Sequence, residues 1–84
     1  MKPAPHVRAS ITDEGIILLD IRSGQIFSAN AVAARIWRGL EQGLPMPAVV
    51  DGIAADAGVD RAIVLRDAAA FLSTLLSRAL VTNR

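Results

Sequence analysis

The hydrophobic pattern changes its period once, at Asn30, and this change limits the fold more than any other feature of the chain. Before Asn30 the apolar residues alternate or form short runs, which is typical of strands. After it they recur every three to four residues, which is typical of helices. No linker separates the two parts. The sequence therefore predicts one α+β domain over residues 1–84, in which a sheet is followed by helices.

Three strands are expected before Asn30. Val7–Thr12 alternates apolar and polar residues, as a half-buried strand does, whereas Ile16–Ile21 is apolar on both faces. Gln25–Ala29 forms the third strand. Residues 13–15 form a turn, and Gly24 can take the positive φ that a tight hairpin needs. Two tight connections predict a three-stranded antiparallel meander with the first and third strands at its edges.

Three helices are expected after the sheet. Asn30 is a suitable N-cap because its side-chain oxygen can accept a backbone N–H, and Gly43 stops the first helix. The second helix is predicted over residues 47–58. The third begins after the cap Asp60 and runs to about Ala79.

The third helix carries an apolar arc that is wide enough to contact more than one neighbour. Part of this arc must face the other helices, and the remainder can line a groove beside the sheet. Phe71 lies at one border of the arc, beside Asp67 and Arg78. The arc itself consists of Val64, Leu65, Ala68, Leu72, Leu75, Leu76 and Ala79.

The residues that most catalytic sites require are scarce. The chain has no cysteine, so neither a disulfide nor a thiolate metal site can form. His6 is the one histidine, and it lies in the Pro-bearing segment 1–6, which we expect to be flexible and solvent-exposed. No phosphate-loop, dinucleotide or zinc-protease motif occurs. We therefore expect no enzyme activity, no cofactor and no metal.

Charge and hydropathy exclude further classes of partner. The net charge of +1 gives little attraction to nucleic acid or to an anionic membrane. No apolar run approaches the 20 or so residues of a membrane-spanning helix, and the amino end lacks the apolar core of a signal peptide. A cysteine-free chain is consistent with a reducing compartment, so the expected location is the cytoplasm.

Three strands with three helices also suggest a winged helix-turn-helix protein, in which the third helix would enter the DNA major groove. That helix opens with Asp60 and Arg61 and continues to Asp67, and the two acids would face phosphates. DNA binding is therefore an alternative with little support from charge.

The strand Gln25–Ala29 has neither the charge nor the Pro that usually protects a sheet edge. An extended peptide can add a strand to such an edge, using backbone hydrogen bonds for affinity and side-chain pockets for specificity. The sequence pattern equally allows this edge to be covered by the tails or by a second copy of the chain.

Several segments together resemble the PqqD-like family, the leader-peptide recognition elements of ribosomally made, post-translationally modified peptide (RiPP) pathways. The resemblance spans roughly residues 7–82 and rests on LLDIRSGQIFSANAVAARIW, on Met46 to Gly58, and on VDRAIVLRDAAAFLSTLLSRALV. Its most specific features are the hairpin with Gly24, the Asn30 junction, and the Asp67, Phe71 and Leu75 spacing. The chain departs from the family at Ala79, where members often have Gly, and at Ala29, where they often have Leu.

The resemblance implies a winged-helix-like, non-enzymatic adaptor. It would bind the leader of a precursor peptide between the third strand and the third helix and present it to a modifying enzyme. The chain is most like the stand-alone recognition proteins of lasso-peptide biosynthesis, which work with a leader peptidase and a cyclase. Stand-alone members also serve radical enzymes as peptide chaperones.

The implied peptide-binding residues lie on these two elements. The strand supplies Gln25, Ile26, Phe27, Ser28 and Ala29, and one border of the helix supplies Val64, Asp67, Ala68, Phe71 and Leu75. The opposite border (Leu65, Ala69 and Leu76) is the alternative.

Overall fold

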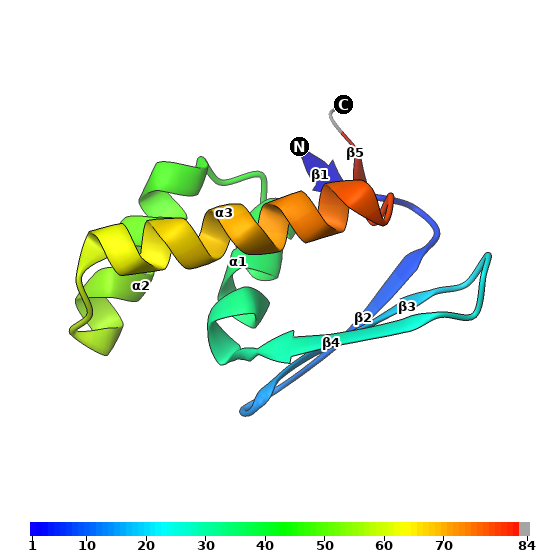
Figure 1. Ribbon diagram of the computed structural model, residues 1–84, viewed down its shortest axis with the longest axis horizontal. Coiled ribbons are helices and arrows are strands. Elements are labelled where there is room, and N and C mark those ends of the chain that lie inside the picture. Colours follow the sequence, from blue (N-terminus) through cyan, green and yellow to red (C-terminus); the bar gives the residue numbers. More distant parts are fainter. Residues whose placement is uncertain (83–84) are drawn as a thin grey trace.

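Sheet strands come first and helices second in the computed structural model, which describes residues 1–82 (Figure 1). The α+β, winged-helix-like class predicted from the change of period at Asn30 is confirmed. The principal elements are β2 (Val7–Thr12), β3 (Gly15–Asp20), β4 (Ile26–Asn30), α1 (Ala31–Glu41), α2 (Met46–Ala57) and α3 (Arg61–Ser77). Two short strands, β1 (Lys2–Pro3) and β5 (Val81–Thr82), lie near the two ends.

The main sheet is an antiparallel meander in the order β2-β3-β4, so β2 and β4 are its edges. Leu18 of β3 lies opposite Ala9 on one side and Phe27 on the other. Residues that lie opposite each other in such a ladder share a face of the sheet. Phe27 and Ala29 therefore point to the same face as the buried Leu18 and Ile16, while Ile17 points to the exposed face.

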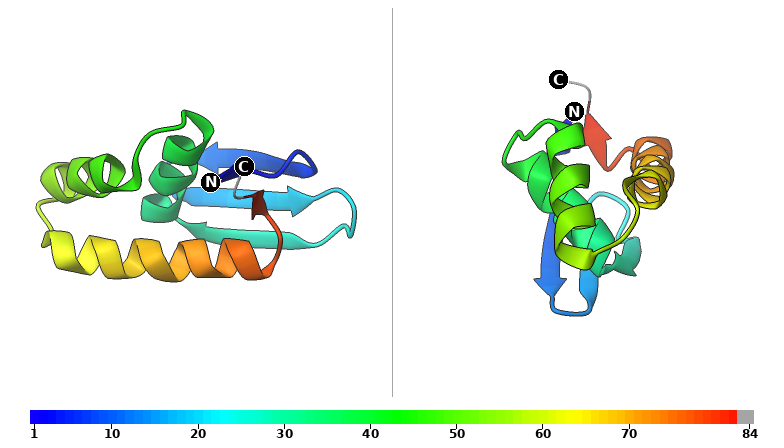
Figure 2. Two further views of the ribbon diagram at one scale, coloured as in Figure 1. Left: turned by 90° about the horizontal axis from the view of Figure 1, so that it is seen from above. Right: turned by 90° about the vertical axis from the view of Figure 1, so that its left-hand side faces the viewer.

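Helix α1 starts where β4 ends and packs on the inner face of the sheet. The Asn30 side chain accepts a hydrogen bond from the Ala33 N–H at 3.0 Å, which satisfies one of the free donors of the first turn. Ile36, Trp37 and Leu40 of α1 belong to the same core cluster as Leu18. α2 packs against α1, and α3 then runs back along the molecule beside β4 (Figure 2).

The predicted boundaries move by one or two residues, for local reasons. β3 ends at Asp20 rather than at Ile21, because the Asp20 carboxylate accepts the Arg22 N–H at 2.9 Å and begins the turn. β4 is shifted one residue along, since Asn30 is both its last residue and the cap of α1. α3 stops at Ser77, because Ala79 takes a positive φ of 56° that no helix continues through.

Residues 1–6, for which the sequence predicts flexibility, lie against the far end of the chain. β1 pairs with β5 in an antiparallel manner, Ala4 is buried, and the His6 Nε2 lies 2.9 Å from the Ala79 carbonyl oxygen. The partners of this segment come from the chain that follows α3. Polar and Pro-bearing composition gives no sign of a partner so distant in sequence.

Candidate functional site

One edge of the main sheet, β4, has free backbone groups on its outer side. The Asp20 N–H donates to the Gln25 carbonyl at 3.0 Å, so the backbone of Gln25 faces β3. Direction alternates along a strand, which turns Phe27 toward β3 and turns the N–H and C=O of Ile26 and Ser28 away from it. Among residues 1–82 no strand pairs with this edge. β4 therefore offers two donors and two acceptors to an added strand.

The inner side chains of β4 meet α3. The Phe27 and Phe71 rings stack with centroids 6.1 Å apart and planes inclined by 22°. The Arg78 guanidinium also lies over the Phe27 ring, with its central carbon 4.9 Å from the ring centroid. The left view in Figure 2 shows α3 running along the β4 side of the sheet. An added strand would thus lie between α3 and β4, with alternate side chains directed at these rings.

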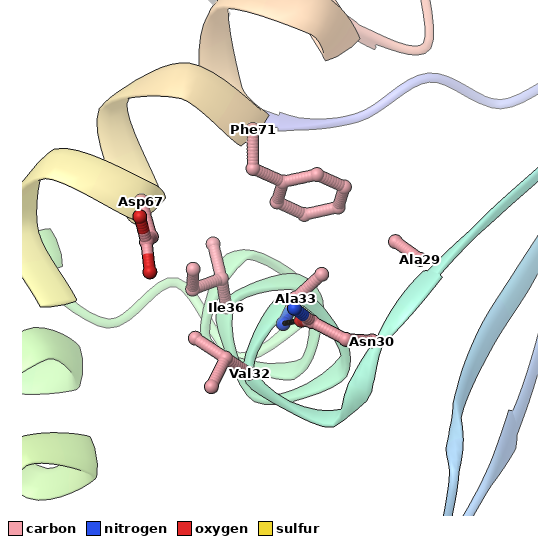
Figure 3. Close-up of a pocket in the computed structure, with 7 residues that line it drawn as sticks. All are labelled: Ala29, Asn30, Val32, Ala33, Ile36, Asp67 and Phe71. Atoms are coloured by element: carbon pink, nitrogen blue, oxygen red, sulfur yellow. Dashed lines mark hydrogen bonds between the residues drawn. The ribbon is translucent and has the colours of Figure 1, made fainter.

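A cavity of about 200 Å³ opens between the end of β4, the start of α1 and the middle of α3. Figure 3 shows Asp67 and Phe71 extending from α3 toward α1, whose Val32 and Ile36 lie opposite them. The lining is apolar apart from Asp67 and the capping Asn30. Its residues are Ala29, Asn30, Val32, Ala33, Ile36, Asp67 and Phe71.

A second, much smaller hollow lies at the hairpin end of β4. It is lined by Leu18, Asp20, Gln25, Ile26, Phe27, Arg78 and Leu80, and its volume is about 20 Å³. The two hollows lie on either side of the stacked rings. We call the whole depression from Asp67 to Arg78, along the inner side of β4, the β4–α3 groove.

Asp20 is the one buried charged residue of the described chain, and it belongs to the hairpin end of the groove. Burial raises the pKa of its carboxyl. The Arg22 N–H and guanidinium, His6 and the Ser23 N–H lower that pKa by more, so the net pKa lies below the usual value. Asp20 is therefore a carboxylate at neutral pH, and it is held by Arg22 through the hydrogen bond and a 3.6 Å ion pair.

The structure divides the residues predicted from the strand into two sets. Phe27 and Ala29 face the groove, whereas Ile26 and Ser28 carry the free backbone groups and alternate to the outer face. Ile26 also contributes to the lining of the small hollow. Gln25 precedes β4 and lines the small hollow.

The residues predicted from the helix also divide. Asp67 and Phe71 line the larger cavity. Val64, Ala68 and Leu75 are buried in the core, where they support α3 from beneath instead of lining the groove. These three occupy positions of the helical stripe that packs inward.

The apolar arc expected on α3 is wider than the face that the fold buries. Leu65 and Leu76, assigned to the arc, are each 44% exposed, while Phe71 is only 9% exposed and belongs to the buried stripe rather than to a border. The stacking of Phe71 on Phe27 puts this side of α3 against the strand. The opposite border, with Leu65, Ala69 and Leu76, faces solvent.

Three groove residues, Val32, Ala33 and Ile36, come from α1 and are absent from the sequence prediction. Their helical spacing is that of core residues, and in the structure their side chains contribute both to the core and to the groove lining. The Asn30 junction is the signal that could have found them, because a helix that begins where the edge strand ends must place its first turns beside that edge.

The sequence model of a known family matches most of the chain. The family is described as coenzyme PQQ synthesis protein D (PqqD), and the match covers residues 15–81. The chain belongs to the PqqD family. The match begins at β3 and includes both β4 and α3, the two sides of the groove.

Two solved structures resemble this PqqD-like chain over nearly its whole length. TbiB1 in complex with the TbiA(beta) leader peptide is 36% identical, with a TM-score of 0.87, and the match covers 100% of this chain and 98% of that one. A lasso peptide synthetase B1 complexed with the leader peptide is 31% identical, with a TM-score of 0.80, covering 92% and 91%. A search of curated proteins finds no match. The resemblance to PqqD-like recognition elements is thereby confirmed.

DNA binding is not favoured for this PqqD-like chain. α3 lies along the sheet, and two of its arginines are beside acids: Arg61 pairs with Asp51, and Arg66 lies 3.7 Å from Asp67. Within residues 1–82 no helix has the length and hydropathy of a membrane crossing, and no group of side chains could hold a metal ion.

Proposed function

We propose that this chain is a non-catalytic adaptor that binds the leader segment of a ribosomally synthesised precursor peptide by strand addition at β4. The observation that carries the proposal is the unpaired β4 edge, with the backbone groups of Ile26 and Ser28 directed outward beside the β4–α3 groove. The two structural relatives, both solved with leader peptides, support it. Residues 1–84 would act as one peptide-binding domain in the cytoplasm.

The adaptor would present the bound precursor to a leader peptidase and a cyclase in lasso-peptide biosynthesis. The lasso peptide synthetase B1 relative supports this pathway. The match to coenzyme PQQ synthesis protein D supports a second candidate, a peptide chaperone for a radical modifying enzyme. Both assignments use the same groove and differ in the enzyme that receives the peptide.

The chemistry of the edge suits sequence-tolerant binding. Each of the four backbone hydrogen bonds would contribute a net of about 0.5–1.5 kcal/mol, whatever the side chains of the leader. Apolar side chains entering the groove would add about 1.5–3 kcal/mol each and supply selectivity. Because the leader is ordered on binding, part of this gain is lost. We expect affinity in the micromolar range or somewhat tighter.

Proline substitution at the edge tests strand addition. Pro lacks the N–H, and an edge position whose N–H faces solvent is where a sheet tolerates it. Ile26→Pro and Ser28→Pro should each abolish binding of the labelled leader peptides of the two structural relatives, measured by fluorescence anisotropy. Far-UV circular dichroism should show that both variants stay folded.

Ile26→Ala and Ser28→Ala are the matched controls, because they shorten the same side chains and keep the N–H. Ser28→Ala should bind nearly as the original chain does. If both proline variants bind the leaders unchanged, or if the original chain binds neither leader, strand addition at β4 is wrong.

A further inference from the structure

The β4–α3 groove is charged oppositely at its two ends. Asp67 contributes the one carboxylate in the lining of the larger cavity, which Ala29 lines from the opposite side (Figure 3). At the other end Arg78 covers the Phe27 ring and lines the small hollow. Figure 3 shows Asp67 directed from α3 into the space between α3 and α1. A chain lying in the groove would therefore pass a negative group and then a positive one.

The neighbouring charges leave both groups able to meet a ligand. Arg66 lies 3.7 Å from Asp67, and both side chains are more than half exposed, so this pair is weak and replaceable. Asp20 shares the small hollow with Arg78, but its carboxylate is held by the N–H and guanidinium of Arg22. Arg78 has no ion-pair partner among residues 1–82.

The spacing of the two charges fits an extended peptide. Asp67 and Arg78 are eleven residues apart, about three helical turns, which separates them by about 16 Å on one side of α3. In a strand every second side chain faces the groove, and residues i and i+4 are about 13 Å apart. The reach of the side chains covers the difference. Residue i+2 then lies over the stacked Phe27 and Phe71 rings.

The direction of the peptide follows from the sheet. Both existing pairings in the main sheet are antiparallel, and antiparallel pairing is slightly more stable per residue than parallel pairing. A strand antiparallel to β4 starts beside Ala29 and ends beside Gln25. Its amino-terminal part thus meets Asp67, and its carboxyl-terminal part meets Arg78.

We propose that the groove selects its peptide by an ordered pair of charges: a basic side chain opposite Asp67, then an acidic side chain four residues later opposite Arg78. An apolar side chain between them contacts the Phe27–Phe71 stack. This selection rests on the proposed leader-binding function and names the class of leader that the chain accepts. Asp67 and Arg78 are specificity-determining residues, while the β4 backbone supplies attachment common to all peptides.

Selection from a displayed library of random dodecapeptides tests the charge pair without requiring a known precursor. Peptides enriched on the original chain should carry Lys or Arg followed, four residues later, by Asp or Glu. With Arg78→Glu the second position should change to a basic residue while the first is unaffected. With Asp67→Lys the first position should change to an acidic one. Each reversal should weaken an original enriched peptide roughly fivefold.

Two variants control for charge in general. Arg38→Glu and Glu41→Lys make the same changes on α1, at residues that line neither hollow of the groove, and both should enrich the original pattern. All variants should keep the far-UV circular dichroism of the original chain.

The outcomes separate the charge selection from the function on which it rests. If enriched peptides lose binding to Ser28→Pro but show no ordered charge pair, or keep it with Arg78→Glu and Asp67→Lys, the charge selection is wrong and strand addition stands. An acidic residue that precedes the basic one would overturn the proposed direction and with it the selection. If no peptide is enriched, or if Ser28→Pro binds the enriched peptides unchanged, both proposals are wrong.

Discussion

Ala79 has a φ of 56°, the one positive value among the described residues other than glycine. This residue ends the turn after α3, and its carbonyl oxygen contacts the His6 ring. The left-handed conformation is unfavourable for a residue with a Cβ and costs Gly nothing. This angle favours Gly, the residue expected here from the resemblance to PqqD-like proteins, and the chain departs from that expectation with Ala79.

Ala79→Gly should therefore stabilise the chain by about 1 kcal/mol, measured by urea unfolding. The matched control is Ala70→Gly, on the exposed face within α3, which should destabilise by about 1 kcal/mol because glycine disfavours helix interiors. If Ala79→Gly is neutral or destabilising, the turn after α3 does not hold the left-handed conformation in solution.

Asp20 is expected to make the stability of the chain depend on pH. Its pKa is lower in the folded chain than in the unfolded one, so its contribution is present above the unfolded pKa and is lost as the pH falls through the folded one. The free energy of unfolding should fall more steeply below about pH 4 in the original chain than in Asp20→Asn.

The measurement is a series of urea titrations of both proteins from neutral pH into the acid range. The gap between the original chain and Asp20→Asn should be widest near neutral pH and should narrow in acid. A gap that stays constant over this range would show that the Asp20 carboxylate is not held by Arg22 and its neighbours.

At the scale of elements, the contact between β4 and α3 both stabilises the fold and shapes the groove, because Phe71 is a core residue and also lines the groove. Phe71→Leu keeps an apolar side chain but removes the ring stack on Phe27, worth about 0.5–1.5 kcal/mol. We expect leader affinity to fall about threefold to tenfold, measured by anisotropy under conditions where the variant is fully folded.

The control for Phe71→Leu is Leu75→Val, one turn further along α3, where the side chain is fully buried and lines neither hollow. It should reduce stability while leaving leader affinity nearly unchanged. If the two variants weaken binding in proportion to their loss of stability, Phe71 acts through the core alone.

The boundaries of the main strands and helices follow from the sequence to within two residues, because each of these elements repeats its hydrophobic pattern over five residues or more. β1 and β5 do not, since two residues are too few to show alternation and each strand has its partner at the other end of the chain. The predicted apolar arc on α3 differs from the buried face for a related reason. Periodicity states which residues are apolar, but the positions of neighbouring elements decide that Phe71 is buried and Leu65 is exposed.

The two sides of the groove were predictable to different degrees. β4 was predicted to be an edge because two tight connections make a meander, and to be an open edge because it carries neither charge nor Pro. The apolar character and spacing of Val32 and Ile36 did not identify them as lining residues, since core and groove side chains on α1 share both; the Asn30 junction was the one local signal. Only the packing of α1 against β4 and α3 distinguishes the two roles.

At the scale of the whole molecule, part of the core lies away from the groove. Trp37 is the single tryptophan, it is 1% exposed, and it lines neither hollow of the groove. Its Nε1 has no hydrogen-bond partner in the structure. The indole is therefore surrounded by apolar groups. It is separated from solvent and from the peptide site.

This placement makes Trp37 a built-in optical reporter. Its intrinsic emission should be blue-shifted in the native protein, move to longer wavelength on denaturation, and hardly respond to an added leader. A single fluorescence titration would then measure both the folded fraction and the peptide occupancy of any variant. The tryptophan emission gives the folded fraction, and a dye on the peptide gives the occupancy.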